Sequence, residues 1–372
     1  MLDSHNHLDT HSSEQQHSIV HICGRYRVGK LLGCGTFSKS FWLRSFNFTK
    51  PLLGNVYLGW DIKMGQDVVL KFEPIQSWHD WLCHKHSVYK VLSNVADIPS
   101  MHWYGREAPY NVLILNCLNL TLEESIFKHH DISLVFSFAN QMVFLFSALY
   151  NLRHLAHITL LQLSCLESIH SWNYIHQDVK PTNFMTGIGE LHSQTFLIDF
   201  GLAQLFHNPS THWHVLLISG LKTVGTIAFT SINSHLELTQ SCCDDLQSLI
   251  YSIVYLFCGW LPWQDIKAGS IERYKDVVLE KKTALVKAPC QGLPLPFVTF
   301  AQHIQLLGFD EKSQYDYLHT LPTQCSVHDS KDVVLDLTTL LHSPCKVGVP
   351  TTLPCGQRMW VQHFTLLLLD LS

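Results

Sequence analysis

Charged residues are scarce in this sequence. Asp, Glu, Lys and Arg make up 15% of its 372 residues, whereas they make up roughly 25% of an average soluble domain. The few Lys and Arg residues form no basic block, so we expect no nucleic-acid partner. Long apolar runs are also missing: the most apolar segment, residues 143–165, contains Arg153, His154 and His157, which are costly in lipid. We therefore expect no membrane span.

A cysteine framework is absent as well. The 12 cysteines include no Cys-x-x-Cys pair, and Cys242 and Cys243 are adjacent, which disfavours a disulfide between them. With no signal peptide evident, we expect reduced thiols in a cytoplasmic or nuclear protein. A chain of this length can bury a large core and form one two-lobed domain or two small ones.

Residues 174–184, YIHQDVKPTNF, are the most informative stretch. Asp178, Lys180 and Asn183 have the spacing of a protein-kinase catalytic loop, His-Arg-Asp-x-x-x-x-Asn. A carboxylate at 178 can accept the proton of an attacking hydroxyl, and a lysine two residues later can hold the transferring phosphoryl group. The amide oxygen of Asn183 can reach a metal ion. This pattern predicts phosphoryl transfer from ATP.

A second motif follows at the expected separation. Leu197-Ile-Asp-Phe-Gly201 places Asp199 directly after an apolar run that is typical of a strand. In kinases an aspartate in this position binds Mg²⁺, so Asn183 and Asp199 are the candidate metal ligands. Two such motifs in the right order are far more specific than either one alone.

The N-terminal part of the sequence predicts a nucleotide-binding loop. Residues 26–38 read as a strand that runs into a glycine-rich turn containing Gly33, Cys34, Gly35 and Phe37. Glycines allow the backbone to approach phosphates closely, and Phe37 can cover them.

Two further strands are predicted after this loop. Residues 55–65 read as the returning strand with its turn, and residues 66–71 as a third strand that ends on Lys71. A lysine in this position pairs with the α- and β-phosphates of ATP in kinases. Lys71 is therefore a candidate ATP ligand.

The chain resembles the casein kinase 1 family of protein kinases, and within it divergent, fungal-like members. The resemblance covers roughly residues 22–321 and extends beyond the general kinase motifs. The shared segments are Ile98-Pro, Trp103-Tyr-Gly, Tyr110-Asn-Val, Ser168-Ile-His-Ser171, Asn183-Phe-Met, Gly225-Thr, Ser231-Ile-Asn233, Asp244-Asp245-Leu, Leu261-Pro-Trp-Gln264, Gly308-Phe-Asp-Glu-Lys312 and Tyr315-Asp-Tyr-Leu318.

This resemblance implies an α+β, bilobal protein-kinase fold with a small β-rich N-lobe and a larger, mostly helical C-lobe. It implies a Ser/Thr protein kinase that uses ATP and Mg²⁺, acts on protein substrates and is a monomer. The expected organisation is a disordered leader (1–21), a kinase domain (22–321) made of an N-lobe (22–115), a hinge (116–118) and a C-lobe (119–321), and a tail (322–372).

The resemblance also assigns positions around the nucleotide. It places Leu115 as the residue that guards the pocket, and Asn116, Cys117 and Leu118 in the hinge that contacts ATP. It places Asp245 on a buried helix, where its carboxylate supports the backbone of the catalytic loop.

Several positions depart from the family pattern. The helix glutamate that would hold Lys71 is replaced by Lys85, and two ammonium groups there would repel each other. Glu73 is a weak substitute partner, because it lies where the strand should end. Gln177 replaces the arginine of His-Arg-Asp, a smaller loss in a family that does not depend on a phosphorylated activation loop.

The substrate side lacks the basic residues with which the family binds acidic or phosphorylated substrates. The matching positions hold Ala228, Asp265, Tyr274 and the pair Cys242 and Cys243. We therefore expect weak recognition of a phosphate on the substrate.

Two segments have no counterpart in the family pattern, residues 39–54 and 143–165. The first could be a long surface loop, which chains tolerate. The second interrupts a core helix between residues 141–142 and 166–170, and could project as a helical hairpin. Alternatively, both are translated introns, which spliced transcripts that retain them as coding sequence would eliminate.

Three functional hypotheses remain open on the sequence alone. The first is an active Ser/Thr kinase, based on the presence of Lys71, Asp178, Lys180, Asn183 and Asp199. The second is a pseudokinase or nucleotide-binding scaffold, based on Lys85. The third is a product that does not fold stably, based on the two extra segments and the low charge.

Overall fold

The computed structural model describes residues 20–34, 55–77, 80–126, 141–264, 266–287 and 293–327. They form an α+β structure that divides into two compact units. Unit 1 is the described part of residues 1–82 and 101–117, and unit 2 is the described part of residues 83–100 and 118–372. The boundary between 117 and 118 lies within the segment expected as the hinge, whereas residues 83–100 group with the C-terminal part of the chain.

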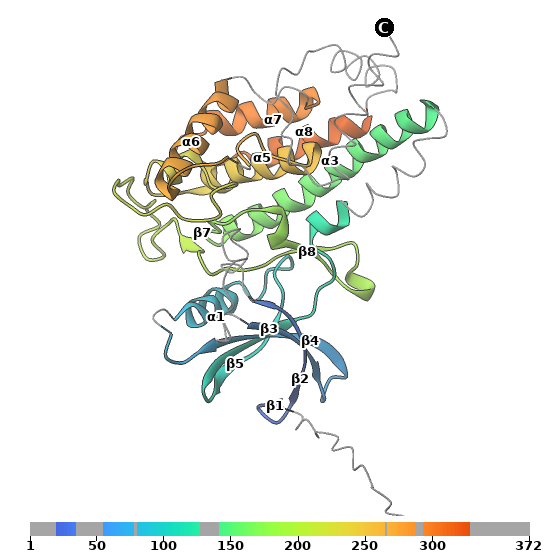
Figure 1. The fold of residues 1–372 in the computed structure, drawn as a ribbon, viewed down its shortest axis with the longest axis vertical. Helices are drawn as coiled ribbons and strands as arrows, with labels where there is room; N and C mark the ends of the chain where they lie inside the picture. The colour runs from blue at the N-terminus through green and yellow to red at the C-terminus, as the bar shows by residue number, and fades with distance from the viewer. Residues whose placement is uncertain are drawn as a thin grey trace, which may run out of the picture. The chain divides into compact units, whose positions relative to one another are not determined.

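Unit 1 contains a six-stranded sheet with the order β1-β2-β3-β4-β6-β5. Strands β1 to β5 are labelled in Figure 1. All neighbouring strands are antiparallel. The strands are β1 (His21–Ile22), β2 (Tyr26–Cys34), β3 (Asn55–Asp61), β4 (Gln66–Pro74), β5 (Met101–Glu107) and β6 (Tyr110–Asn116). The three strands predicted from the first part of the sequence are therefore confirmed, and the segment between β2 and β3, residues 35–54, lies outside the described residues.

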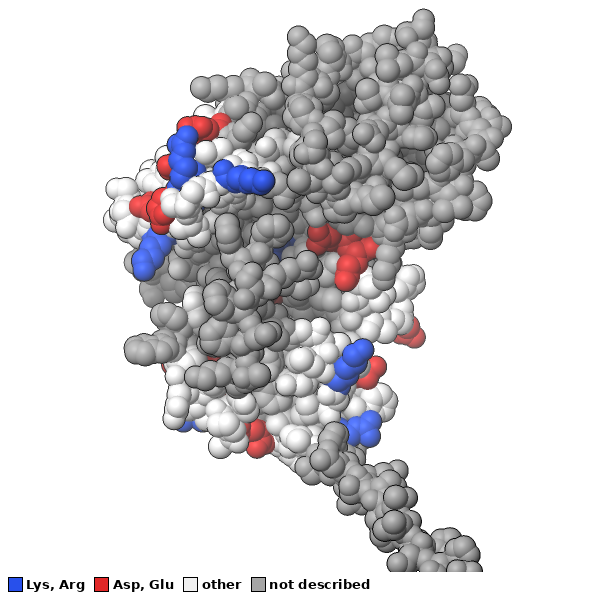
Figure 2. All heavy atoms as spheres, in the orientation of Figure 1, with Lys and Arg blue, Asp and Glu red and all other residues white. Residues whose placement is uncertain are grey.

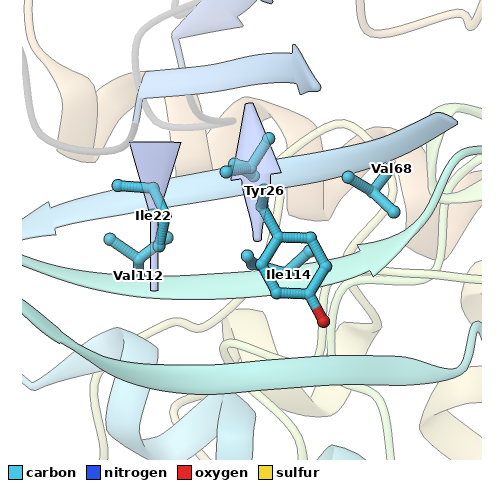
Figure 3. Close-up of a cluster of buried hydrophobic side chains, with 6 residues drawn as sticks. Ile22, Tyr26, Val68, Val112 and Ile114 are labelled. Carbon is cyan, nitrogen blue, oxygen red and sulfur yellow. The ribbon is translucent and has the colours of Figure 1, made fainter. Parts of the chain in front are cut away.

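One face of this sheet carries a hydrophobic core. Successive side chains of a strand point to opposite faces, so Val68 and Leu70 of β4 share a face and are both fully buried. They pack with Ile22, Tyr26, Val112 and Ile114 (Figure 3). Each fully buried aliphatic side chain contributes roughly 1.5–3 kcal/mol relative to exposure, so this cluster fixes the strand that carries Lys71.

Unit 2 is mainly helical. The helices α3, α5, α7 and α8 pack against one another, and α4 packs against α6. Their bounds are α3 (Gln141–Ser171), α4 (Ile232–His235), α5 (Cys242–Cys258), α6 (Ile271–Lys287), α7 (Leu295–Leu306) and α8 (Tyr315–Val327). Helix α1 (Trp81–Val91) belongs to unit 2 from Cys83 onward. No helix among the residues described here is long and apolar enough to cross a membrane.

Helix α3 corrects one expectation from the sequence. Residues 143–165 do not interrupt a helix or form a hairpin; they belong to one continuous helix of 31 residues (Figure 1). From Leu152 onward its buried residues recur every three or four positions, among them Leu155, Thr159, Gln162 and Leu163. This is the period of one helix face, so the segment that has no counterpart in the family supplies core positions.

Helix α8 runs across the boundary expected between the kinase domain and the tail. It continues past Leu321 through Pro322 to Val327. Residues 328–372 and residues 1–19 of the expected leader lie outside the described part of the chain.

Helix α5 is the most buried helix of unit 2 with described side chains throughout. Ser241 precedes it, and the Ser241 backbone N–H donates to Asp244 Oδ2 at 2.7 Å, which satisfies a backbone donor at the helix start. The helix ends at Gly259, whose φ of 76° is the left-handed conformation favoured by glycine. Asp245 therefore lies in the first turn of a firmly bounded helix.

Candidate active site

The predicted catalytic loop lies between two short strand pairs of unit 2. Strand β7 (Tyr174–Ile175) pairs with β10 (Gln204–Leu205) before the loop, and β8 (Phe184–Thr186) pairs with β9 (Thr195–Leu197) after it. A 3-10 helix, η2 (Pro181–Asn183), begins with a proline, which suits the first position of a helix. The loop is thus fixed at both ends, with Asp178 between them.

Asp178 is the centre of a hydrogen-bonded group. Its Oδ1 accepts from the Thr226 backbone N–H at 2.8 Å and from Thr226 Oγ1 at 2.7 Å. Its Oδ2 accepts from Lys180 Nζ at 2.6 Å. Lys180 also donates to Thr226 Oγ1 at 2.8 Å, so the carboxylate, the ammonium group and the hydroxyl form a closed set.

Gly225 explains how Thr226 reaches this carboxylate. The φ of Gly225 is 93°, a conformation that other residues rarely adopt. A Cβ atom there would lie 2.5 Å from the carbonyl oxygen of Gln177. A side chain at 225 would therefore push the segment away from the loop. The contact of Thr226 with Asp178 was not predicted from the sequence, in which Gly225-Thr is only a segment shared with the family pattern.

Asn183 and Asp199 are both placed beside the loop. Asn183 is 1% exposed, and its Nδ2 donates to the Asp178 carbonyl oxygen at 2.8 Å. The Ile198 backbone N–H donates to the Asn183 carbonyl oxygen at 2.9 Å, next to Asp199 in the chain. Asp199 has a φ of 69°, which is uncommon for a residue other than glycine and is often found at functional sites.

Asp245 supports the loop through its backbone. Its Oδ2 accepts from the His176 backbone N–H at 2.6 Å, and its Oδ1 accepts from the Gln177 backbone N–H at 2.9 Å. His170 Nε2 lies 3.0 Å from the same Oδ2. The two hydrogen bonds from the His176 and Gln177 backbone N–H groups are the kind of backbone contact expected of Asp245. They connect the first turn of α5 to the loop that carries Asp178.

Lys85 has a partner that the sequence did not indicate. Its Nζ lies 2.6 Å from Asp199 Oδ1, and the two side chains are 18% and 14% exposed. From the sequence, Lys85 was expected only to replace the helix glutamate and to repel Lys71. The structure pairs Lys85 with the candidate metal ligand, because α1 packs along the residues that follow Asp199.

The donors for a metal ion do not fit a divalent cation in this arrangement. The Asp199 carboxylate is already compensated by an ammonium group at 2.6 Å. The other candidate ligand, Asn183, contributes only a neutral amide. Within the described ranges, no three His, Cys, Asp or Glu side chains come together as a metal site. A second cation at Asp199 would meet like-charge repulsion from Lys85.

Among the predicted ATP ligands, Lys71, Leu115 and Asn116 lie in unit 1. Lys71 lies in β4, paired across the sheet with Val56 and Leu113. Leu115 is 3% exposed in β6, and Asn116 ends that strand.

The glycine-rich turn is described only in part. Gly33 and Cys34 are the last residues of β2 and pair with Val56 and Asn55. Gly35 and Phe37 fall outside the described residues. Leu118 belongs to unit 2, so the structure assigns the predicted ATP ligands to separate units.

Glu73 contacts the start of helix α1. It is 5% exposed, and its Oε2 accepts from the Leu82 backbone N–H at 3.1 Å. This N–H belongs to the first turn of α1, where backbone donors lack partners within the helix and a negative charge is favourable. Glu73 thus holds the start of the helix that carries Lys85.

The positions that the resemblance assigns to the substrate side carry no basic side chain. Cys242 and Cys243 are both buried, and burial raises the pKa of the Cys243 thiol to about 12. The Ala228 carbonyl oxygen accepts from Trp263 Nε1 at 2.7 Å. Asp265 lies outside the described residues.

A comparison of the chain with models of known protein families finds no match.

Proposed function

We propose that this chain is a Ser/Thr protein kinase of casein kinase 1 type, which transfers the γ-phosphoryl group of ATP to hydroxyl groups of protein substrates. The proposal rests on one observation, the closed hydrogen-bonded set formed by Asp178, Lys180 and Thr226. This set brings a carboxylate and an ammonium group together in a loop whose backbone is held by a second buried carboxylate, Asp245.

The proposed reaction uses these groups in separate roles. The substrate hydroxyl oxygen forms a bond to the γ-phosphorus, the bond from that phosphorus to the β-phosphate oxygen breaks, and ADP leaves. Asp178 accepts the hydroxyl proton. Lys180 offsets negative charge on the transferring group. Thr226 fixes the carboxylate through two hydrogen bonds, which limits its freedom before substrate arrives.

The bilobal kinase fold is part of this proposal. A unit built on an antiparallel sheet, a mainly helical unit and a chain boundary between Cys117 and Leu118 support it. We propose that unit 1 is the N-lobe, unit 2 the C-lobe, and residues 116–118 the hinge. The proposed protein is a monomer in the cytoplasm or nucleus.

A transfer assay with radiolabelled ATP and a general Ser/Thr substrate tests the activity. We expect Asp178→Asn to lower turnover at least about a hundredfold, while the Kd for ATP changes by less than about threefold. Asp276→Asn, which alters an exposed carboxylate on α6, is the matched control and should keep full turnover. Wild-type protein without transfer above the Asp178→Asn background would contradict the proposal.

The second candidate function is a nucleotide-binding protein with weak or no transfer. The ion pair between Lys85 and Asp199 favours this alternative. Lys85 stands in place of the helix glutamate, and its ammonium group also occupies the carboxylate of the candidate metal ligand. ATP binding without turnover in the same assay would select this alternative.

A further inference from the structure

Helix α1 is attached to the segment 199–203 by several contacts within unit 2. His84 Nε2 lies 2.9 Å from the Ala203 carbonyl oxygen. One helical turn beyond Lys85, the Tyr89 hydroxyl accepts from the Asp199 backbone N–H at 3.4 Å, and its ring packs edge-on against Phe200 with centroids 5.1 Å apart. Tyr89 is 1% exposed. His84 and Tyr89 lie on either side of Lys85 along the helix. Their contacts hold α1 against residues 199–203, so the Lys85 side chain reaches Asp199.

Gly201 provides the space that Lys85 occupies. A Cβ atom at 201 would lie 2.8 Å from Lys85 Cε and 3.4 Å from its Nζ. Any side chain at this position would therefore displace the end of the lysine. The ammonium group lies beside Gly201 and the Asp199 carboxylate, and both charged side chains are mostly shielded from water.

An ammonium group at this place can substitute for part of what a metal ion does. The ammonium group lies 2.6 Å from a carboxylate oxygen of Asp199, an atom that Mg²⁺ would bind at about 2.0–2.1 Å. An ammonium group has three N–H donors, and lysine is a common ligand of phosphate groups. Unlike Mg²⁺, it is attached to the chain and needs no ion from solution.

We propose that Lys85 is a fixed counter-cation at Asp199, which excludes a divalent metal ion from this carboxylate and supplies positive charge to the phosphates of a bound nucleoside triphosphate. This inference rests on the proposed function, because it takes ATP as the ligand of the site. It makes nucleotide binding independent of divalent metal, and it makes Lys85 a residue that determines the cation requirement.

Calorimetric titration with ATP, in EDTA and in excess Mg²⁺, tests the phosphate half of the proposal. We expect the wild-type Kd for ATP to differ by less than about threefold between the two conditions, and Lys85→Met to bind at least about tenfold more weakly in EDTA than in Mg²⁺. Lys90→Met alters an exposed lysine on the same helix and should behave as wild type.

Mn²⁺ alone, followed by electron paramagnetic resonance without nucleotide, tests the exclusion half. We expect no Mn²⁺ binding by the wild type and binding by Lys85→Met that is lost when Asp199→Asn is added. Gly201→Ala is the second variant, in case Lys85→Met does not fold. Its methyl group displaces Lys85 rather than removing it, and it should also acquire Mn²⁺ binding.

The outcomes separate this inference from the proposed function. ATP binding by the wild type that requires Mg²⁺ would overturn the role of Lys85 and leave the kinase proposal standing. Equal Mn²⁺ binding by the wild type and by Lys85→Met would also overturn the role of Lys85 and leave the kinase proposal standing. Failure to bind ATP in either condition would overturn both proposals.

Discussion

Lys282 is fully buried in α6 and has no carboxylate among its hydrogen-bond partners in the described structure. Its Nζ donates to the Ile227 carbonyl oxygen at 2.9 Å and to the Thr230 carbonyl oxygen, and lies 3.2 Å from His235 Nε2. The ring of Tyr251 lies 4.6 Å from it. Burial lowers the pKa of Lys282, while these acceptors and the aromatic face favour its charged form. One side chain thereby fixes the turn that follows Thr226.

His235 leads to a prediction about pH. Burial, with the nearby Lys282 and Lys275 ammonium groups, lowers the pKa of His235 from 6.5 to about 3. Below pH 6.5 the unfolded chain gains a proton at this position that the folded chain does not bind, so acidification favours unfolding. Between about pH 7 and about pH 5, we expect the wild type to lose about 1–2 kcal/mol more unfolding free energy than His235→Gln.

Urea denaturation at the two pH values measures this difference. His157→Gln changes an exposed histidine of α3 and should keep the wild-type pH dependence. If wild type and His235→Gln lose the same unfolding free energy on acidification, His235 is not buried in its neutral form.

At the scale of elements, residues 143–165 lie within the continuous helix α3. The buried residues from Leu152 to His170 follow the period of one helix face. The helix packs against α5 and α8. Its Cys165 Sγ contacts the carbonyl oxygen of Thr195 at 3.6 Å, and Thr195 belongs to β9, the strand before Asp199. Removal of this segment would therefore remove core contacts near the candidate active site.

Leu163 tests this conclusion. It is 0% exposed, so Leu163→Ala removes buried apolar atoms and leaves a cavity, and we expect a loss of about 2–5 kcal/mol in unfolding free energy. His157→Ala, on the exposed face of the same helix, should change it by less than about 0.5 kcal/mol. Thermal or urea unfolding gives both values. A Leu163→Ala protein as stable as wild type would place this segment outside the core.

At the scale of the whole molecule, the small number of charges limits which substrates can be recognised. Figure 2 shows Lys and Arg scattered singly or in small groups over a face that is mostly uncharged where it is described. The buried, uncharged thiols of Cys242 and Cys243 stand where the family pattern has arginines. Lys275 donates to Thr223 Oγ1 at 3.2 Å, near the proposed substrate side.

This charge distribution predicts the response to substrate phosphorylation. A bound phosphate needs charge-assisted hydrogen bonds, so a phosphate placed upstream of the target serine should raise kcat/KM by less than about threefold. Matched phosphorylated and unphosphorylated peptides measure this ratio. A gain above about tenfold would show that other cations form a phosphate site, and its loss in Lys275→Met would identify that lysine.

The sequence by itself determined the local elements and the residues of the loop. The strands predicted at residues 26–38, 55–65 and 66–71 appear in the structure as strands that begin at Tyr26, Asn55 and Gln66. The spacing of Asp178, Lys180 and Asn183 predicts a shared loop, because these residues are too close in the chain to separate.

Only the tertiary structure decided which distant groups meet. Thr226 lies 48 positions from Asp178, and Ala203 lies 119 positions from His84. Sequence spacing does not determine such contacts, because they depend on how whole elements pack. The continuity of α3 was likewise decided by packing, since its buried face lies against α5 and α8 and also contacts β7 and β9. The packing of α1 against residues 199–203 gives Lys85 a carboxylate partner that its position in the sequence did not indicate.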